Sequence, residues 1–223
     1  MKKICIVSVF CVVLLSASGF GREIVDRIVA DVNGHIILQS DWDEEVAFEA
    51  FLDARAVNSF TAAERKAALD RLIDQELLRE QVNPPQNSPA EQLADRLAEI
   101  RKLHKEATTD ELWRAALARY GFTEAELQKR LATDVELMKS VEARLRPSVQ
   151  IDSHAIERYY QEHLLPELRR AGGAEVPLSQ VSTHIKNLLA EQKLNELLSN
   201  WLASLRSESR IQRPDSNSGE QSR

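Results

Sequence analysis

The feature that most restricts the fold is the stretch from Ile24 to Asp41, which reads IVDRIVADVNGHIILQSD. Two short apolar runs are joined by Asn33 and Gly34, and both residues tolerate the positive φ angles that a type I′ turn requires. The stretch therefore predicts a β-hairpin. The residues expected on its core face are Ile28, Ala30, Val32, Ile36 and Leu38. Because an isolated hairpin is only marginally stable in water, we expect another segment to pair with it.

Helical signals dominate the rest of the chain. Ser, Thr or Asp followed by Glu or Gln three positions later, as in Thr61 to Glu64 and Thr123 to Glu126, is a capping box that begins a helix. Gly121 and Pro147 are helix-ending signals. The helices predicted in this way span about 42–56, 61–81, 88–103, 109–120, 123–146, 153–164 and 178–206.

Apolar residues at helical spacing predict which side of each helix is buried. The last helix has an unusually wide apolar surface between Val181 and Leu205, which predicts that it packs on two sides. Along the earlier helices the residues expected in the core include Val46, Ala50, Phe51, Ala54, Leu69, Ile73, Leu77, Ile100, Leu103, Val135, Met138 and Val141.

The two ends of the chain have different characters. Residues 1–21 combine Lys2 and Lys3 with a short apolar run and small residues, which is typical of a secretory signal peptide. Cleavage after Ala17, Gly19 or Gly21 fits, with Gly21 favoured, and an uncleaved anchor is the alternative. At the other end, residues 209–212 predict a third strand beside the hairpin, and residues 214–223 form a polar tail. The folded core between them is expected to be residues 22–213.

Charge and cysteine content exclude several classes of protein. The net charge is −6 and no basic stripe is present, which argues against nucleic-acid binding. Both cysteines lie in the leader, so the mature chain is expected to have no disulfide and no thiol ligand. No run after the leader is apolar enough to span a membrane as a helix.

Catalytic and metal-binding patterns are not apparent. The histidines are too widely spaced to form an HxxxH or HExxH pair, so no metal or other cofactor is expected. Asp41, Asp43, Glu44 and Glu45 cluster in the first turn of a predicted helix, where negative charge complements the helix dipole. We interpret this cluster as a cap and expect no catalytic residues.

Aromatic side chains are the remaining candidates for a functional surface. Most should be buried, but Tyr159 and Tyr160 are adjacent and cannot both face inward. A peptide-binding surface needs exposed apolar groups on rigid helices. The residues proposed to contact a bound polypeptide are Trp113, Tyr120, Phe122, Tyr159 and Tyr160.

The hairpin and the helix after it carry a family resemblance. The segments 25–30, 32–34 and 36–41 resemble the opening of SurA-type periplasmic chaperones, and the run ALDRLIDQELL at 68–78 resembles the next helix of that family. Weaker similarity continues at 156–163 and 192–205. The resemblance implies a mainly α, multi-helix SurA-like chaperone core with a small N-terminal β-hairpin joined by a C-terminal strand. It also implies a periplasmic holdase for unfolded outer-membrane or envelope polypeptides.

The chain departs from the fuller members of that family in one place. Those members insert a parvulin prolyl isomerase domain before the last helix, whereas here only residues 169–176 intervene. Eight residues span at most about 28 Å and cannot contain a catalytic domain. We therefore expect no isomerase activity. The alternative functions are a peptidyl-prolyl isomerase and a homodimeric structural or assembly partner of an envelope complex.

Overall fold

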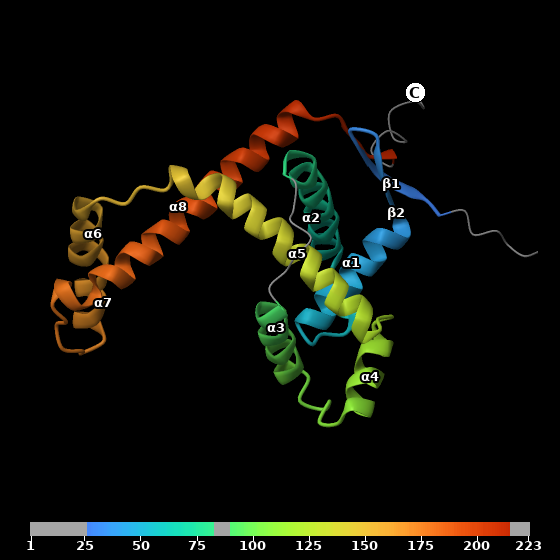
Figure 1. Cartoon of the computed structure of the whole chain (residues 1–223), viewed down its shortest axis with the longest axis horizontal. Helices are drawn as coiled ribbons and strands as arrows, with labels where there is room; N and C mark the ends of the chain where they lie inside the picture. The colour runs from blue at the N-terminus through green and yellow to red at the C-terminus, as the bar shows by residue number, and fades with distance from the viewer. Residues whose placement is uncertain (1–25, 83–89, 215–223) are drawn as a thin grey trace, which may run out of the picture.

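The structure is a computed structural model that describes residues 26–82 and 90–214, and it is mainly helical with one small sheet (Figure 1). A body contains the sheet and the first five helices, and an arm extends from it along the last helix. The predicted signal peptide and residues 215–223 of the predicted tail lie outside the described residues.

The sheet brings the two ends of the described chain together. Strands β1 (Ile28–Val32), β2 (His35–Leu38) and β3 (Ile211–Gln212) are antiparallel and lie in the order β2-β1-β3. Asn33 and Gly34 have φ angles of 53° and 98°, as the tight turn requires. The predicted hairpin and the predicted third strand are both confirmed.

The predicted core face of the hairpin is partly wrong. Because the turn has two residues, Val32 pairs with His35 and Ala30 pairs with Ile37, so the even-numbered face of β1 continues on odd-numbered residues of β2. Ile37 is therefore buried, whereas Ile36 is 46% exposed. A bulge between Ile28 and Ala30 also leaves Ile28 on the surface, and Leu38 is half-buried.

Asn33 joins three parts of the chain at the turn. Its backbone N–H donates to the Arg210 carbonyl at 3.0 Å, and its side-chain oxygen accepts the Arg210 N–H at 2.9 Å. Its side-chain nitrogen donates to Glu80 at 2.8 Å. The same residue therefore forms the tight turn and holds the C-terminal strand against the body.

Helical capping follows the sequence closely. Thr61 and Thr123 form the predicted capping boxes, and Thr109 caps the short fourth helix. The helices of the body, with two short 3₁₀ turns, are α1 (Gln39–Leu52), η1 (Val57–Ser59), α2 (Ala62–Gln81), α3 (Ala90–Leu103), α4 (Asp110–Arg119), α5 (Glu124–Leu145) and η2 (Arg146–Ser148).

Helix α1 differs from its prediction at both ends. Asp41 accepts the Leu38 N–H at 2.8 Å from inside the first turn, and Asp26 accepts hydrogen bonds from Ser40, so the helix begins at Gln39. It ends at Leu52 because Ala54 adopts a positive φ of 50°. Ala54 is therefore exposed and does not extend the buried face.

Two cores fill the body. The first lies between the sheet, α2, the second half of α5 and the end of α8 (Leu178–Glu208), and its buried residues include Val32, Ile37, Ile73, Leu77, Leu137, Val141 and Leu205. The second lies between α1, α3, α4 and the start of α5, and its buried residues include Phe48, Phe51, Ile100, Trp113, Leu117, Phe122 and Leu127.

Helix α5 contributes to both cores, and this explains one wrong prediction. A single stripe continued from Leu131 would bury Met138, but Met138 is 48% exposed and Leu137 is buried. The buried side of α5 shifts because its neighbours change along its length. Directly after α3, His104 is buried in the place expected for Leu103, which is 55% exposed.

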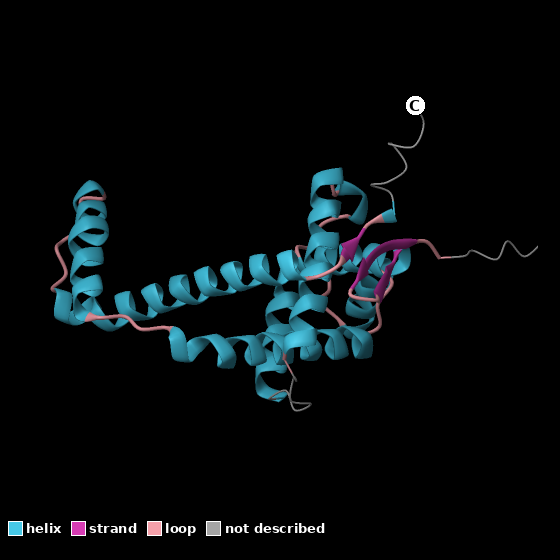
Figure 2. Ribbon diagram, turned by 90° about the horizontal axis from the view of Figure 1, so that it is seen from above, coloured by secondary structure: helices cyan, strands magenta, loops and turns pink. Residues whose placement is uncertain are grey.

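The arm is formed by α6 (Ser153–Tyr159), the π-helical turn η3 (Tyr160–Leu164) and α7 (Leu165–Arg170), which pack on the first half of α8 (Figures 1 and 2). The π-helical turn ends where Pro166 lies in the first turn of α7. Proline cannot donate a backbone hydrogen bond and clashes with the carbonyl four residues earlier, so a widened turn accommodates it.

Helix α8 connects the arm to the body, and it packs on two sides as predicted. Ile185 is buried in the arm and Leu205 is buried in the first core. At roughly 100° per residue these two side chains point about 200° apart around the helix. Its wide apolar surface therefore consists of two stripes on opposite faces. One stripe packs in the arm, and the other packs in the first core of the body. Only residues 171–177 lie between α7 and α8, so no domain is inserted there.

Candidate functional site

Trp113 and Phe122 lie inside the second core. They are 2% and 6% exposed, and both pack near Phe51, which is fully buried. Tyr120 is half-buried at the edge of the same core, and its hydroxyl donates to the Arg55 carbonyl at 2.9 Å. The expected exposed aromatic surface around α4 is therefore absent from this region, because these rings fill the space between α1, α3 and α4.

Tyr159 and Tyr160 lie in the arm and differ in burial, as their adjacent positions require. Tyr160 is 8% exposed, and its hydroxyl donates to the Val176 carbonyl at 2.7 Å. Tyr159 is half-buried and packs against the ring of His163, with the ring centroids 5.0 Å apart. Of the five predicted contact residues, Tyr159 and Tyr120 are the two that retain substantial exposed area.

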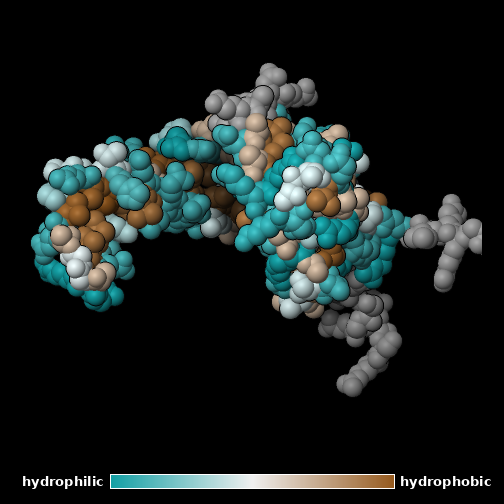
Figure 3. Space-filling view, turned by 90° about the horizontal axis from the view of Figure 1, so that it is seen from below, coloured by the Kyte–Doolittle hydropathy of each residue, from teal (hydrophilic) through white to brown (hydrophobic). Residues whose placement is uncertain are grey.

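The arm leaves much of its apolar surface in contact with solvent. Its core has three buried residues, Tyr160, Leu165 and Ile185, and twice as many apolar residues around them are only half-buried. Figure 3 shows hydrophobic atoms at the end of the arm and where the arm meets the body. A shallow pocket of about 430 Å³ opens beside Leu164 and Leu168.

The middle of α8 continues this surface towards the body. Leu188, Leu194 and Leu197 are half-buried, and they belong to none of the three cores of the described residues. They lie in the part of the helix where its buried side changes from the arm to the body. An apolar surface of this kind on a rigid helix is suited to binding apolar segments of another polypeptide.

A second hollow lies on the body, between β2, α1, α2 and α5. Two adjoining pockets of about 290 and 330 Å³ share Glu44, Leu72, Arg79 and Arg130. The first extends to Ile36 on β2 and the second to Thr133 and Asp134 on α5. We call the two pockets together the hairpin groove. Its apolar lining residues are Ile36, Ile37 and Leu72, and its other lining residues are polar or charged.

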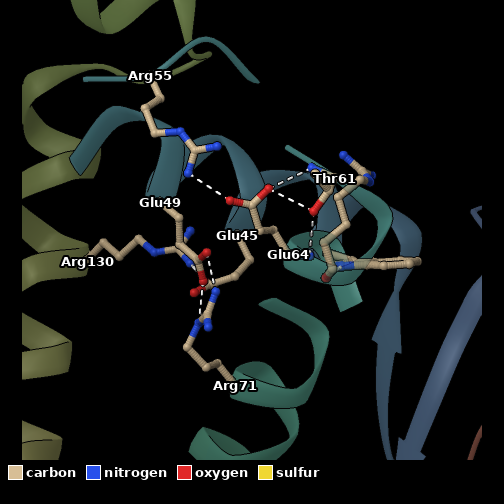
Figure 4. A network of polar contacts seen from close by, with 9 residues as sticks. Glu45, Glu49, Arg55, Thr61, Glu64, Arg71 and Arg130 are labelled. Atoms are coloured by element: carbon tan, nitrogen blue, oxygen red, sulfur yellow. Dashed lines mark hydrogen bonds and ion pairs between the residues drawn. The ribbon is translucent and has the colours of Figure 1, made fainter. Parts of the chain in front are cut away.

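A network of ion pairs lies along α1 beside the groove (Figure 4). Arg130 on α5 reaches Glu45 and Glu44, and its guanidinium lies 4.1 Å from the centre of the Phe48 ring. Glu49 pairs with Arg71 on α2, where both carboxylate oxygens accept hydrogen bonds. The predicted acidic cap is therefore only part of the role of this cluster, because Glu45 faces inward.

Glu45 is the most perturbed carboxyl group in the network. It is 3% exposed, and this burial raises its pKa from the ordinary 4.5 to about 7, although the charge of Arg130 acts in the opposite direction. Burial also raises the pKa of Asp134 on the facing helix. By contrast, hydrogen bonds from Thr61 and Arg55 lower the pKa of Glu64 to about 2.

His104 is buried beside Phe51. Its Nε2 lies 2.8 Å from the Phe51 carbonyl, and its ring stacks on Phe51 at 4.3 Å between centroids. Across residues 26–82 and 90–214, no group of three or more His, Cys, Asp or Glu residues is arranged to hold a metal ion. In the same ranges, no helix has the combination of length and apolar content needed to cross a bilayer.

The sequence interpretation missed the hairpin groove and its residues. Ile36 was assigned to the buried face, Glu45 was interpreted as part of a helix cap, and Arg130 was not singled out. A signal for Ile36 was present in the two-residue turn, since such a turn pairs even-numbered residues of one strand with odd-numbered residues of the other. For Glu45, the spacing of four residues from Glu49 and Asp41 on one helix does not distinguish a buried carboxylate from an exposed one.

Comparison with known proteins covers the part of the chain that builds the body. The sequence pattern of the SurA-like N-terminal domain matches residues 1–141, which is more than half of the chain. A search of curated proteins finds no match. The matched region includes the hairpin, α1 to α4 and most of α5, and therefore every residue that lines the hairpin groove. This chain belongs to the SurA-like N-terminal domain family.

Proposed function

We propose that this protein is a periplasmic, ATP-independent chaperone that holds unfolded outer-membrane or other envelope polypeptides. Membership of the SurA-like family supports a chaperone role. The observation that carries the proposal is the thin core of the arm, which leaves half-buried apolar side chains on α6, α7 and the middle of α8.

A holdase without an energy source must bind its clients with moderate affinity so that they can leave. Shallow apolar surface meets this need better than a deep pocket, since it excludes water from a client segment without enclosing it. The net charge of −6 favours solubility of the protein both with and without a client on its apolar surface.

The test is suppression of aggregation. An unfolded outer-membrane β-barrel precursor diluted from urea should scatter much less light in the presence of a near-stoichiometric amount of the protein. Replacing Leu194 and Leu197 by glutamine should weaken this suppression, because the middle of α8 loses apolar surface. The matched control is Leu112→Gln, which changes an equally apolar residue that is 47% exposed on α4 and far from the arm.

Two results would contradict the proposal. One is the absence of suppression by the unmodified protein with several unrelated β-barrel clients. The other is an equal loss of suppression in the α8 variant and the α4 control, which would mean that the arm has no special part in binding.

We also propose that the protein acts without prolyl isomerase catalysis. The connection between α7 and α8 consists of residues 171–177, and the resemblance to SurA-type chaperones implies that fuller members carry the catalytic domain at this place. A proline-containing tetrapeptide should isomerise at the same rate with the protein as in buffer. A rate that rises in proportion to protein concentration would overturn this part of the proposal.

A further inference from the structure

Strand β2 forms one edge of the sheet, and its backbone has a free side. In a hairpin with a two-residue turn, the closing pair exchanges hydrogen bonds and the next pair directs its N–H and C=O groups outward. Here the closing pair is Val32 and His35, and the next pair is Asp31 and Ile36. The outward side of Asp31 faces Gln212 on β3. The corresponding side of Ile36 faces away from the sheet.

The outward groups of Ile36 have no partner among residues 26–82 and 90–214. No backbone or side-chain hydrogen bond within these ranges links them to a segment outside the sheet. Proteins usually protect such an edge with Lys, Pro or a covering helix, because an extended chain can pair with it. Here the side chain at the edge is an isoleucine that is 46% exposed.

The hairpin groove begins at this edge. Ile36 and Ile37 line its first pocket, and Leu72 lines both pockets. A chain added beside β2 would therefore place some of its side chains against these apolar residues. Among the charged residues that line the groove, acidic residues outnumber basic ones, with Asp41, Glu44, Glu76, Glu126 and Asp134 against Arg79, Lys129 and Arg130.

We propose that the free edge of β2 and the hairpin groove bind an extended client segment as an added strand. The favoured segment alternates apolar and polar residues and carries lysine or arginine, which the acidic excess of the groove attracts. This inference rests on the proposed chaperone function and adds a second binding mode to the apolar arm. On β2, Ile36 is the one residue whose N–H and C=O point away from the sheet without a partner in the described ranges. A client strand therefore forms few main-chain hydrogen bonds with β2 and dissociates quickly.

The decisive variant is Ile36→Pro. Proline removes the outward N–H but keeps an apolar side chain, and edge strands tolerate proline where the missing N–H would face solvent. The control is Ile36→Val, which retains both the N–H and a β-branched side chain. The probe is a fluorescein-labelled peptide that alternates threonine with valine or tyrosine and carries a lysine at each end, followed by fluorescence anisotropy.

We expect the wild type and Ile36→Val to bind the peptide equally, and Ile36→Pro to bind it at least about fivefold more weakly, which corresponds to the loss of one hydrogen bond. A second measurement covers the case in which Ile36→Pro does not fold. The same peptide with its central amides N-methylated cannot pair with an edge and should bind the wild type more weakly by a similar factor.

Three outcomes would overturn the inference. The first is binding by folded Ile36→Pro within twofold of the wild type, and the second is undiminished binding of the N-methylated peptide. The third is a wild-type dimer in light scattering that Ile36→Pro abolishes, which would assign the edge to a second copy of the chain. If the wild type suppresses aggregation in any of these cases, the chaperone proposal stands and only the strand addition fails.

Discussion

Replacing Phe51 by alanine should lower the free energy of unfolding by about 3–5 kcal/mol, because it deletes a whole ring from a packed core. Phe51 is fully buried on α1 and has the rings of His104, Trp113 and Tyr120 around it at 4.3, 5.6 and 5.4 Å. These rings come from the end of α3 and from α4, so one side chain joins three helices. Urea unfolding followed by the fluorescence of the tryptophans measures the loss.

The control for this prediction is Leu112→Ala, which removes a large side chain from α4 that is 47% exposed. It should change the free energy of unfolding by less than about 0.5 kcal/mol. A loss below about 1 kcal/mol for Phe51→Ala would contradict the packing described for the second core.

Replacing Arg130 by alanine should have a large effect that depends on pH. Glu45 is 4% exposed at its side chain, and Arg130 is the cation that pairs with it. Removal of the cation leaves a buried carboxylate without a charged partner, which costs about 3 kcal/mol when the carboxylate is ionised. At about pH 5 the buried carboxyl group holds a proton, so the loss should fall to about 1 kcal/mol.

The stability of the wild type should also depend on pH, in a direction that follows from the pKa of Glu45. The folded pKa of Glu45 is about 7, above its ordinary value of 4.5. Between these values the folded protein holds a proton that the unfolded chain has released, so stability falls as pH rises through this window. The raised pKa of Asp134 acts in the same direction as that of Glu45, whereas carboxyl groups with lowered pKa, such as Glu64 at about 2, act at more acidic pH.

Chemical denaturation at a series of pH values tests both statements. Glu45→Gln should flatten the decline between about pH 5 and pH 8, and in that background Arg130→Ala should cost less at about pH 8 than it does in the wild type. Glu44→Gln is the control, because Glu44 pairs with the same arginine but is 61% exposed at its side chain. An equal effect of Arg130→Ala at both ends of the pH range would rule out the proposed linkage.

Local features were predicted well wherever a few neighbouring residues control them. The Asn33-Gly34 turn, the capping boxes at Thr61 and Thr123 and the helix end at Gly121 all appear at the expected positions. Each depends on a backbone angle or a hydrogen bond that spans no more than a few residues. The pairing of residues 211–212 with β1 was also predicted, because the hairpin needed a partner and a short segment follows the last helix at the far end of the chain.

Errors arose where burial depends on segments distant in the sequence. Met138 and Leu103 have the right spacing for a single stripe, but α5 lies between two cores, and His104, directly after α3, is buried in place of the leucine. Trp113 and Phe122 were assigned to a surface because they flank a short helix, yet α1 covers them with Phe51 and Phe48. Periodicity identifies a buried side but does not identify the neighbour that buries it.

The order of amino acids was sufficient to determine the hairpin, the helix boundaries set by caps, and the two-sided character of α8, since these follow from local backbone preference and side-chain spacing. The arm, the hairpin groove and the burial of Glu45 beneath Arg130 depend on which helices meet, and they became visible once the helices were assembled. The physical reason is that the exposure of a side chain, and hence its pKa and its availability to a client, is set by atoms from residues distant in sequence.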